Sequence, residues 1–230
     1  MKNEIQNNKL LIMGKLSATL AHEIRNPLSA LKLNLNYLKM SEEEFDPEVI
    51  ECLNSCVEAV ERIQDLIENT LEFSRTPTKD EKETSINEIS MQAVDILSGM
   101  AKKKNINIVS ELDEKLPLLL VNRNKILQVF INLITNAIDA SERNSSISLR
   151  SYQNSKKDVI FEVEDKGVGI KEEVKDKIFS DFYTNKKQGT GLGLSVCKKL
   201  LEEFESEISF KSEENIGTCF KIVFPQKLIK

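Results

Sequence analysis

The sequence predicts a chain of two parts, an antiparallel hairpin of two long helices followed by an α/β domain. Two observations predict this architecture. Between residues 10 and 71, apolar side chains recur every three or four positions, which is the period of amphipathic helices. Beyond residue 84, shorter stretches with the helical period alternate with stretches of period two, as in α/β domains. With 230 residues, 40% of them hydrophobic, the chain is long enough to form substantial cores.

The helical part begins near residue 10, and an acidic loop at residues 41–45 separates its two helices. Asp46-Pro47 starts the second helix, with a capping carboxylate before a proline at the first helical position, and Thr76-Pro77 ends it. The first apolar stripe is Met13, Leu16, Leu20, Ile24, Leu28, Leu31, Leu35 and Leu38, and the second is Val49, Leu53, Cys56, Val60, Ile63, Ile67, Thr70 and Leu71. A lone hairpin gives each helix one neighbour, so we expect two copies to pair into a dimeric four-helix bundle.

The second part follows a polar segment without apolar period, which we interpret as a linker over residues 77–84. The expected domains are therefore residues 1–76 and 85–230. Within the second domain we expect helices at 90–103, 124–140 and 192–204, and strands at 106–112, 147–152, 159–163, 208–211 and 218–224.

The composition argues against several classes of protein. No apolar stretch approaches the roughly 20 residues of a membrane helix, and the N-terminus lacks a signal-peptide core, so we expect a cytoplasmic chain or the cytoplasmic portion of a membrane-bound protein. The net charge is -5, and acidic and basic residues are interspersed along the chain, so the sequence shows no basic cluster of the kind that binds nucleic acid. The four cysteines fit neither a zinc ribbon nor a disulfide framework, and we expect reduced, buried thiols; Cys52 and Cys56 with His22 would lack a fourth metal ligand.

His22 is the only histidine of the chain, so any reaction that uses an imidazole of this chain must use His22. Its helical phase, between Leu20 and Ile24, places it opposite the apolar stripe and facing solvent, with Glu23 beside it and Asn26 on the same face. Pro27 removes a helical hydrogen bond to the carbonyl of Glu23 at a cost of about 3 kcal/mol, which favours a functional bend over a structural accident.

Two glycine-rich loops in the second domain indicate a phosphate site. Residues 165–169, Asp-Lys-Gly-Val-Gly, follow a strand, and residues 189–194, Gly-Thr-Gly-Leu-Gly-Leu, lead into a helix. Glycines let backbone amides approach phosphates, and the helix N-terminus adds partial positive charge. Lys186 and Lys187 precede the second loop and could neutralise phosphate oxygens.

Asn132 and Asn136 lie four residues apart on the apolar helix and share a face. Buried amides need partners, and a packing or capping pair is one interpretation. Next to a phosphate-binding loop, a Mg²⁺ ligand is the better one, because Mg²⁺ prefers oxygen donors.

Together these residues resemble the core of a sensor histidine kinase of the two-component class. The resemblance covers nearly the whole chain: residues 20–28 resemble the phosphoacceptor box, 132–137 the N box, 165–169 the first glycine box, 179–186 the phenylalanine-rich lid, 189–193 the second glycine box, and 217–218 the third. It implies a dimerisation and phosphoacceptor hairpin followed by a two-layer α/β sandwich of the Bergerat type that binds ATP and Mg²⁺.

The resemblance also implies residue roles. His22 would be phosphorylated on the ring nitrogen remote from the backbone, Glu23 would take the proton from the other nitrogen, and Asp165 would hydrogen-bond the adenine amino group. Asn136 would give its amide oxygen to Mg²⁺, with Asn132 toward the phosphates. The remaining nucleotide contacts would come from Gly167, Gly169, Lys186, Gly189, Thr190, Gly191, Leu192, Gly193 and Thr218. The partner would be the receiver domain of a response regulator.

Four positions qualify these implications. Related ATPases of this fold carry a glutamate at the place of Asn132; an amide cannot take a proton from water, which favours a transferase over a hydrolase. Asn122 and Asp181 stand where the family usually has aspartate and proline. Asn26 matches a position that orients water against a phosphoaspartate, implying reverse phosphatase activity, although it fits a plain surface amide equally well.

Two other functions stay open. A nucleotide-gated interaction protein would keep both glycine loops and dispense with Glu23. A plain ATPase would release phosphate without forming a phosphoprotein, and the amide at Asn132 argues against it.

Overall fold

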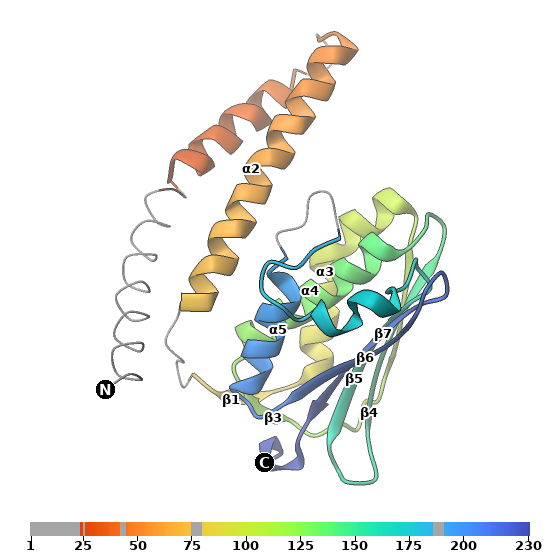
Figure 1. The fold of residues 1–230 in the computed structure, drawn as a ribbon. Helices are drawn as coiled ribbons and strands as arrows, with labels where there is room; N and C mark the ends of the chain where they lie inside the picture. The colour runs from red at the N-terminus through yellow and green to blue at the C-terminus, as the bar shows by residue number, and fades with distance from the viewer. Residues whose placement is uncertain (1–23, 25, 42–44, 75–79, 186–190) are drawn as a thin grey trace, which may run out of the picture. The chain divides into compact units, whose positions relative to one another are not determined.

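The computed structural model describes residue 24 and residues 26–41, 45–74, 80–185 and 191–230, which fall into two units. One unit holds the helical hairpin and the other the α/β fold (Figure 1).

The hairpin consists of a helix at residues 26–39 and of α2 (Pro47–Ser74), drawn in red and orange in Figure 1. The backbone carbonyl of Asp46 accepts hydrogen bonds from the amides of Val49 (2.9 Å) and Ile50 (3.1 Å), so α2 starts where the Asp-Pro signal predicted. Leu28, Leu53 and Val60 are buried within the unit. The predicted hairpin of two long helices is confirmed.

The expectation of buried cysteines is wrong for Cys52 and Cys56, which are exposed on α2. Leu53 and Val60 of the same helix are buried, so the two exposed thiols lie outside the buried side of α2. Cys197 is buried, as expected, and Cys219 is half-buried.

The α/β unit contains three longer helices and two sheets. Its elements are β1 (Lys82–Thr84), α3 (Ile86–Lys104), β2 (Asn107–Leu112), β3 (Leu119–Val121), α4 (Arg123–Ala140), β4 (Ser146–Gln153), β5 (Val159–Asp165), η2 (Glu172–Lys177), α5 (Gly193–Glu202), β6 (Glu207–Glu213), β7 (Gly217–Phe224) and η3 (Gln226–Leu228). The main sheet has the order β2-β4-β5-β7-β6, with β2 and β4 parallel and the other pairs antiparallel. β1 pairs with β3 separately.

The helices α3, α4 and α5 cover one face of the main sheet, giving the predicted two-layer sandwich (Figure 1). The core lies between these layers, where the ring of Phe130 on α4 stacks on that of Phe161 on β5 at a centroid distance of 3.9 Å. Alternate residues of β4, β5 and β7 are buried, as expected for strands covered on one face. This packing fixes α4, which carries Asn132 and Asn136, against β5, which ends at Asp165.

The structure differs from the prediction at the start of this unit. Lys82–Thr84, the last residues of the predicted linker, form β1 because they pair with β3, a strand that the sequence pattern did not reveal. Helix α3 begins at Ile86, before the predicted Ser90, because the Ser85 hydroxyl caps it by accepting from the amide of Glu88. Asn122 has a comparable role, since its side-chain oxygen accepts from the amides of Asn124 and Lys125 at the start of α4.

No helix within the described residues is both long and apolar enough to cross a membrane.

Candidate functional site

The site lies along α4, whose middle adjoins the start of α5 and whose last residue adjoins the loop after β5. These contacts join residues that are far apart in the chain.

Asp165 is the last residue of β5 and is buried, with 5% of its surface exposed. Its carboxylate accepts a 2.8 Å hydrogen bond from the amide of Gly167 and another from the backbone of Thr218. Burial raises the pKa of Asp165, and these two hydrogen bonds partly oppose the rise. An acidic side chain kept in such surroundings is the sort of group found at functional sites.

The first glycine loop is held tightly between α4 and the β6–β7 hairpin. A Cβ at Gly167 would lie 2.2 Å from the carbonyl oxygen of Ala140, the last residue of α4, so only glycine fits. The same carbonyl accepts from the amide of Val168 at 3.2 Å. Gly169 has a φ of +65° and lies against the backbone of Glu213. The loop is therefore fixed to the end of the helix that carries the two asparagines.

Asn132 and Asn136 are both half-buried on α4. The side-chain nitrogen of Asn132 is buried and has no hydrogen-bond partner among the described residues. Its side-chain oxygen would lie 3.6 Å from a Cβ at Gly193, the first residue of α5. A buried amide N–H without an acceptor costs free energy unless a ligand supplies one.

The second glycine loop is described only from Gly191 onward; Lys186, Lys187, Gly189 and Thr190 lie outside the described residues. Gly191 has a φ of +72°, and a Cβ there would lie 2.4 Å from the carbonyl carbon of Phe182. Leu192 is buried and precedes α5, whose start has no side-chain cap. The positive end of the helix dipole is thus placed beside Asn132.

Thr218 is buried on β7 directly opposite Asp165 in the strand pairing. Its hydroxyl lies 2.8 Å from that of Ser212 on β6, which also accepts from the amide of Ile170 at 2.8 Å. The sequence reasoning missed Ser212. The pairing of Ser212 with Thr218 across the β6–β7 turn could have revealed it.

One ion pair joins α4 to α5 away from the glycine loops. The ammonium of Lys125 lies 2.6 Å from a carboxylate oxygen of Glu203, and the side chains are 9% and 28% exposed. This pair, which the sequence reasoning also missed, fixes the far end of α5.

His22 and Glu23 lie outside the described residues. Asn26 is described, is helical and is exposed, while Leu28 is buried. The exposure of Asn26 agrees with the phase that was predicted for this face of the helix.

Comparison with known proteins divides the chain in the same way. Residues 12–78 match the family described as His Kinase A (phospho-acceptor) domain, and residues 121–228 match the family described as histidine kinase-, DNA gyrase B-, and HSP90-like ATPase.

Similar proteins include sporulation kinase E of Bacillus subtilis, 32% identical over 96% of this chain, and the signal transduction histidine-protein kinase AtoS of Escherichia coli, 29% identical over 96%. The chain covers 29% and 36% of their lengths, so it spans about a third of each.

Among solved structures, the catalytic domain of histidine kinase ThkA is 36% identical, with a TM-score of 0.58 over 64% of this chain and 96% of that domain. A complex of ThkA with the response regulator protein TrrA matches 96% of this chain and 64% of that chain, at 30% identity and a TM-score of 0.66.

Proposed function

The chain belongs to the histidine kinase family, and from that premise we propose that it is an ATP-dependent autokinase that phosphorylates His22 and passes the phosphoryl group to an aspartate of a separate response regulator. The observation that carries the proposal is that α4 adjoins both Gly193, next to Asn132, and the loop after Asp165, next to Ala140. The single histidine of the chain lies in a phosphoacceptor match.

The loop after β5 suits an adenine. A buried carboxylate that already accepts from two backbone amides is rigid, and its remaining acceptor capacity can take the N–H of an exocyclic amino group. We assign Asp165 to the adenine amino group, with Gly167, Gly169 and Thr218 shaping the loop around the base.

The other end of the site suits phosphates. The unpartnered amide nitrogen of Asn132 can donate to a phosphate oxygen, and the start of α5 adds amides and partial positive charge. The backbone of Gly189, Thr190, Gly191, Leu192 and Gly193, together with Lys186, would hold the triphosphate. The amide oxygen of Asn136, which is half-buried on the same helix as Asn132, is a donor of the kind that Mg²⁺ prefers, and Mg²⁺ bound there would neutralise charge on the phosphates.

The transfer step needs a nucleophile and a base from the hairpin. The ring nitrogen of His22 remote from the backbone forms a bond to the γ-phosphorus as the bond from phosphorus to the bridging oxygen of ADP breaks. Glu23 takes the proton from the other ring nitrogen. Asn132 cannot act as a base toward water, so the γ-phosphoryl group is kept for the imidazole.

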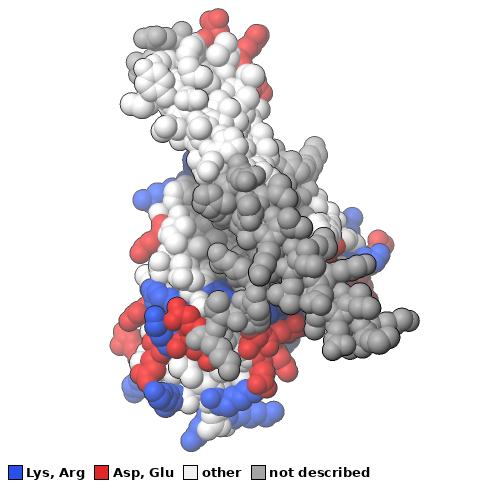
Figure 2. Space-filling model, turned by 90° about the vertical axis from the view of Figure 1, so that its left-hand side faces the viewer, with Lys and Arg blue, Asp and Glu red and all other residues white. Residues whose placement is uncertain are grey.

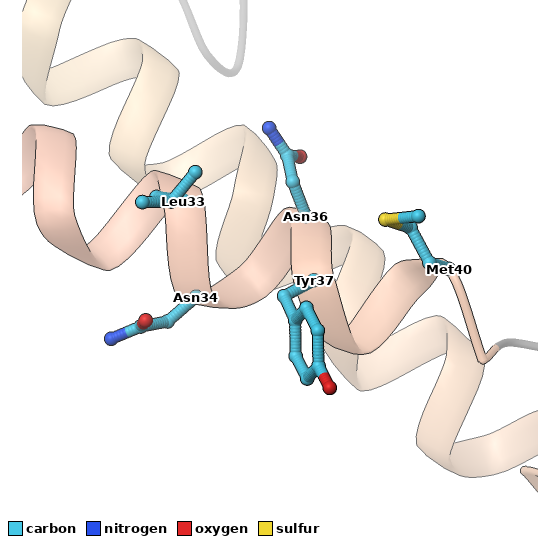
Figure 3. A pocket seen from close by; sticks show the side chains of 5 residues that line it. All are labelled: Leu33, Asn34, Asn36, Tyr37 and Met40. Atoms are coloured by element: carbon cyan, nitrogen blue, oxygen red, sulfur yellow. The ribbon is translucent and has the colours of Figure 1, made fainter.

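The helix at residues 26–39 carries an uncharged outer face suited to a protein partner. Leu33, Tyr37 and Met40 are 70%, 73% and 85% exposed and line a shallow pocket with Asn34 and Asn36 (Figure 3). Asn26, Leu33 and Met40 are spaced by seven residues, close to two helical turns, so they share the face on which His22 is expected. We propose that the receiver domain docks here.

A space-filling view supports an uncharged docking surface. The described part of the hairpin presents mostly uncharged atoms in this view, with acidic side chains near the end that carries the turn (Figure 2). Leu33→Asp should therefore slow transfer to the receiver at least tenfold while leaving autophosphorylation in the same sample within twofold, because a charge would have to be desolvated on docking. Equal loss of both steps would contradict this role.

A second set of apolar side chains suits a homodimer. Leu31, Leu38, Val49 and Ile63 are 42–48% exposed in the single hairpin, although they belong to the stripes predicted to face a core. A second copy would cover them in a four-helix bundle.

We assign a cytoplasmic location to this core, whether it stands alone or forms part of a membrane-bound sensor.

The test of the proposed function is labelling with radioactive ATP and Mg²⁺. Wild-type protein should form an acid-labile, base-stable phosphoprotein, and His22→Gln should form none; because the chain has one histidine, phosphohistidine has one possible position. Equal labelling of His22→Gln would refute the assignment. Asn136→Ala should also abolish labelling while leaving His22 able to accept a phosphoryl group from a wild-type protomer, if transfer runs between chains.

Similar experiments distinguish two alternative functions. If Glu23→Gln retains partner binding and function without phosphoryl transfer, the chain is a nucleotide-gated interaction protein. Steady phosphate release without phosphoprotein would indicate an ATPase. Rapid dephosphorylation of the phosphorylated regulator, lost in Asn26→Ala, would add the reverse phosphatase activity.

A further inference from the structure

A tight turn at residues 180–183 leads away from the short helix η2 and carries an unusual pair of central residues. The amide of Tyr183 donates to the carbonyl of Ser180 at 3.3 Å, which closes the turn. The third residue, Phe182, has a φ of +64°, whereas Asp181 has no positive φ. Positive φ at the third position alone is the mark of a type II turn.

Neither central residue is one that this turn prefers. Type II turns favour proline at the second position, where Asp181 stands, and glycine or asparagine at the third, where Phe182 stands. A bulky residue in the left-handed region is strained by about 1–3 kcal/mol. The ring of Phe182 is 73% exposed, so burial of that ring does not hold the turn in place.

Contacts on two sides of the turn hold it instead. On one side, the ammonium of Lys199 on α5 lies 3.8 Å from a carboxylate oxygen of Asp181, with both side chains about two-fifths exposed. On the other side, the carbonyl of Phe182 packs against Gly191 so closely that a Cβ there would lie 2.4 Å from it. The turn therefore connects the body of α5 to the glycine loop that precedes it.

We propose that the Asp181–Lys199 ion pair replaces the conformational restriction that proline would give this turn, and that it positions the second glycine loop for the phosphates of ATP. The inference rests on the proposed nucleotide site. Asp181 and Lys199 are positioning residues, since they act through the Phe182–Gly191 contact. Because an exposed ion pair weakens as salt screens it, part of the affinity for ATP becomes sensitive to ionic strength.

The expected effects are modest and follow from the exposure of the pair. Removing an exposed ion pair should weaken ATP binding about two- to fivefold. Asp181→Pro should bind ATP about two- to fivefold more tightly than Asp181→Ala, because proline restricts the unfolded and open forms of the turn. None of the hydrogen bonds among the described residues uses the backbone N–H of Asp181, so proline removes no bond of the turn.

The experiment measures ATP binding by calorimetry with the full chain, at low and at high salt. At low salt, Asp181→Ala and Lys199→Ala should each bind ATP about two- to fivefold more weakly, while Asp181→Pro stays within about twofold of wild type. At about 1 M salt the difference between wild type and Asp181→Ala should disappear. Lys199→Ala should weaken ATP binding less in the Asp181→Pro background than in the wild type.

Lys230→Ala is the matched control, since it breaks an exposed ion pair with Glu83 that lies on β1. It should leave ATP binding unchanged at both salt concentrations. Wild-type affinity in Asp181→Ala and Lys199→Ala, or an equal loss from Lys199→Ala with proline at 181, would overturn the inference. A wild-type chain that binds no ATP would instead overturn the proposed function.

Discussion

Removing Glu203 from its ion pair with Lys125 should lower the free energy of unfolding much more than removing Lys125. Lys125 is 9% exposed and lies in the first turn of α4, where the helix dipole disfavours a cation; Glu203 is 28% exposed at the end of α5. The acid that is left without its partner can be hydrated, whereas the base cannot.

The magnitudes follow from this difference in burial. Glu203→Ala leaves a buried ammonium at the positive end of a helix and should cost about 3 kcal/mol of unfolding free energy, the low end for breaking a buried pair. Lys125→Met keeps most of the apolar stem and should cost about 1 kcal/mol. The double variant should be more stable than Glu203→Ala alone, because it removes the unpaired charge.

The assay is urea unfolding followed by hydrogen-exchange mass spectrometry of peptides from α4 and α5. Because Gly193 at the start of α5 adjoins Asn132, Glu203→Ala should also weaken ATP binding, and Lys230→Ala serves as the control. Equal costs for the two single variants, or an additive double variant, would refute the reasoning about burial.

Three further changes test the site. Asp165→Asn should abolish ATP binding yet raise the thermal midpoint at pH 7, because burial raises the pKa of Asp165 and its ionised form destabilises the native state. Calorimetry should show that this gain in stability shrinks as the pH falls through the raised pKa. A gain that is the same at every pH would contradict this reasoning. Gly167→Ala should cost about 1–3 kcal/mol in urea unfolding and weaken ATP binding, since its Cβ meets the Ala140 carbonyl at 2.2 Å; unchanged stability would show that the loop yields freely. Burial raises the pKa of Cys197 to about 12, so iodoacetamide should modify it only on unfolding, and rapid labelling of the native protein would contradict the packing.

The order and type of the main elements could be predicted because they depend on local patterns. The stripe of α2 and its Asp46-Pro47 start, like the alternation in β4 and β5, are readable from neighbouring residues. β1 and β3 could not be predicted, because each has only three residues and is defined by pairing with distant parts of the chain: β1 with β3, and β3 also with Ile229. The burial of Cys52 and Cys56 was misjudged for a related reason: an apolar period shows that a face avoids water and does not show which partner covers it.

The candidate site divides in the same way. The glycine loops, the asparagine pair and Asp165 stand out in the sequence because their residue types are informative by themselves. Ser212 and Lys125 do not stand out, since serines and lysines are common on surfaces, and Asp181 stands out only as a departure from the proline that is usual in the family. Their importance comes from contacts with Thr218, Glu203 and Lys199.

The sequence by itself determined the chemistry that this chain offers: one imidazole, a carboxylate beside it, two amides on a helix and two glycine loops. Those are properties of residue type and spacing, and they can be recognised without knowledge of the tertiary structure. Only the tertiary structure decided that the amide of Asn132 lies buried beside Gly193 without a partner, and that the carbonyl of Phe182 rests on Gly191. Such contacts join residues from separate elements, and they are set by how helices pack on a sheet, which no local pattern encodes.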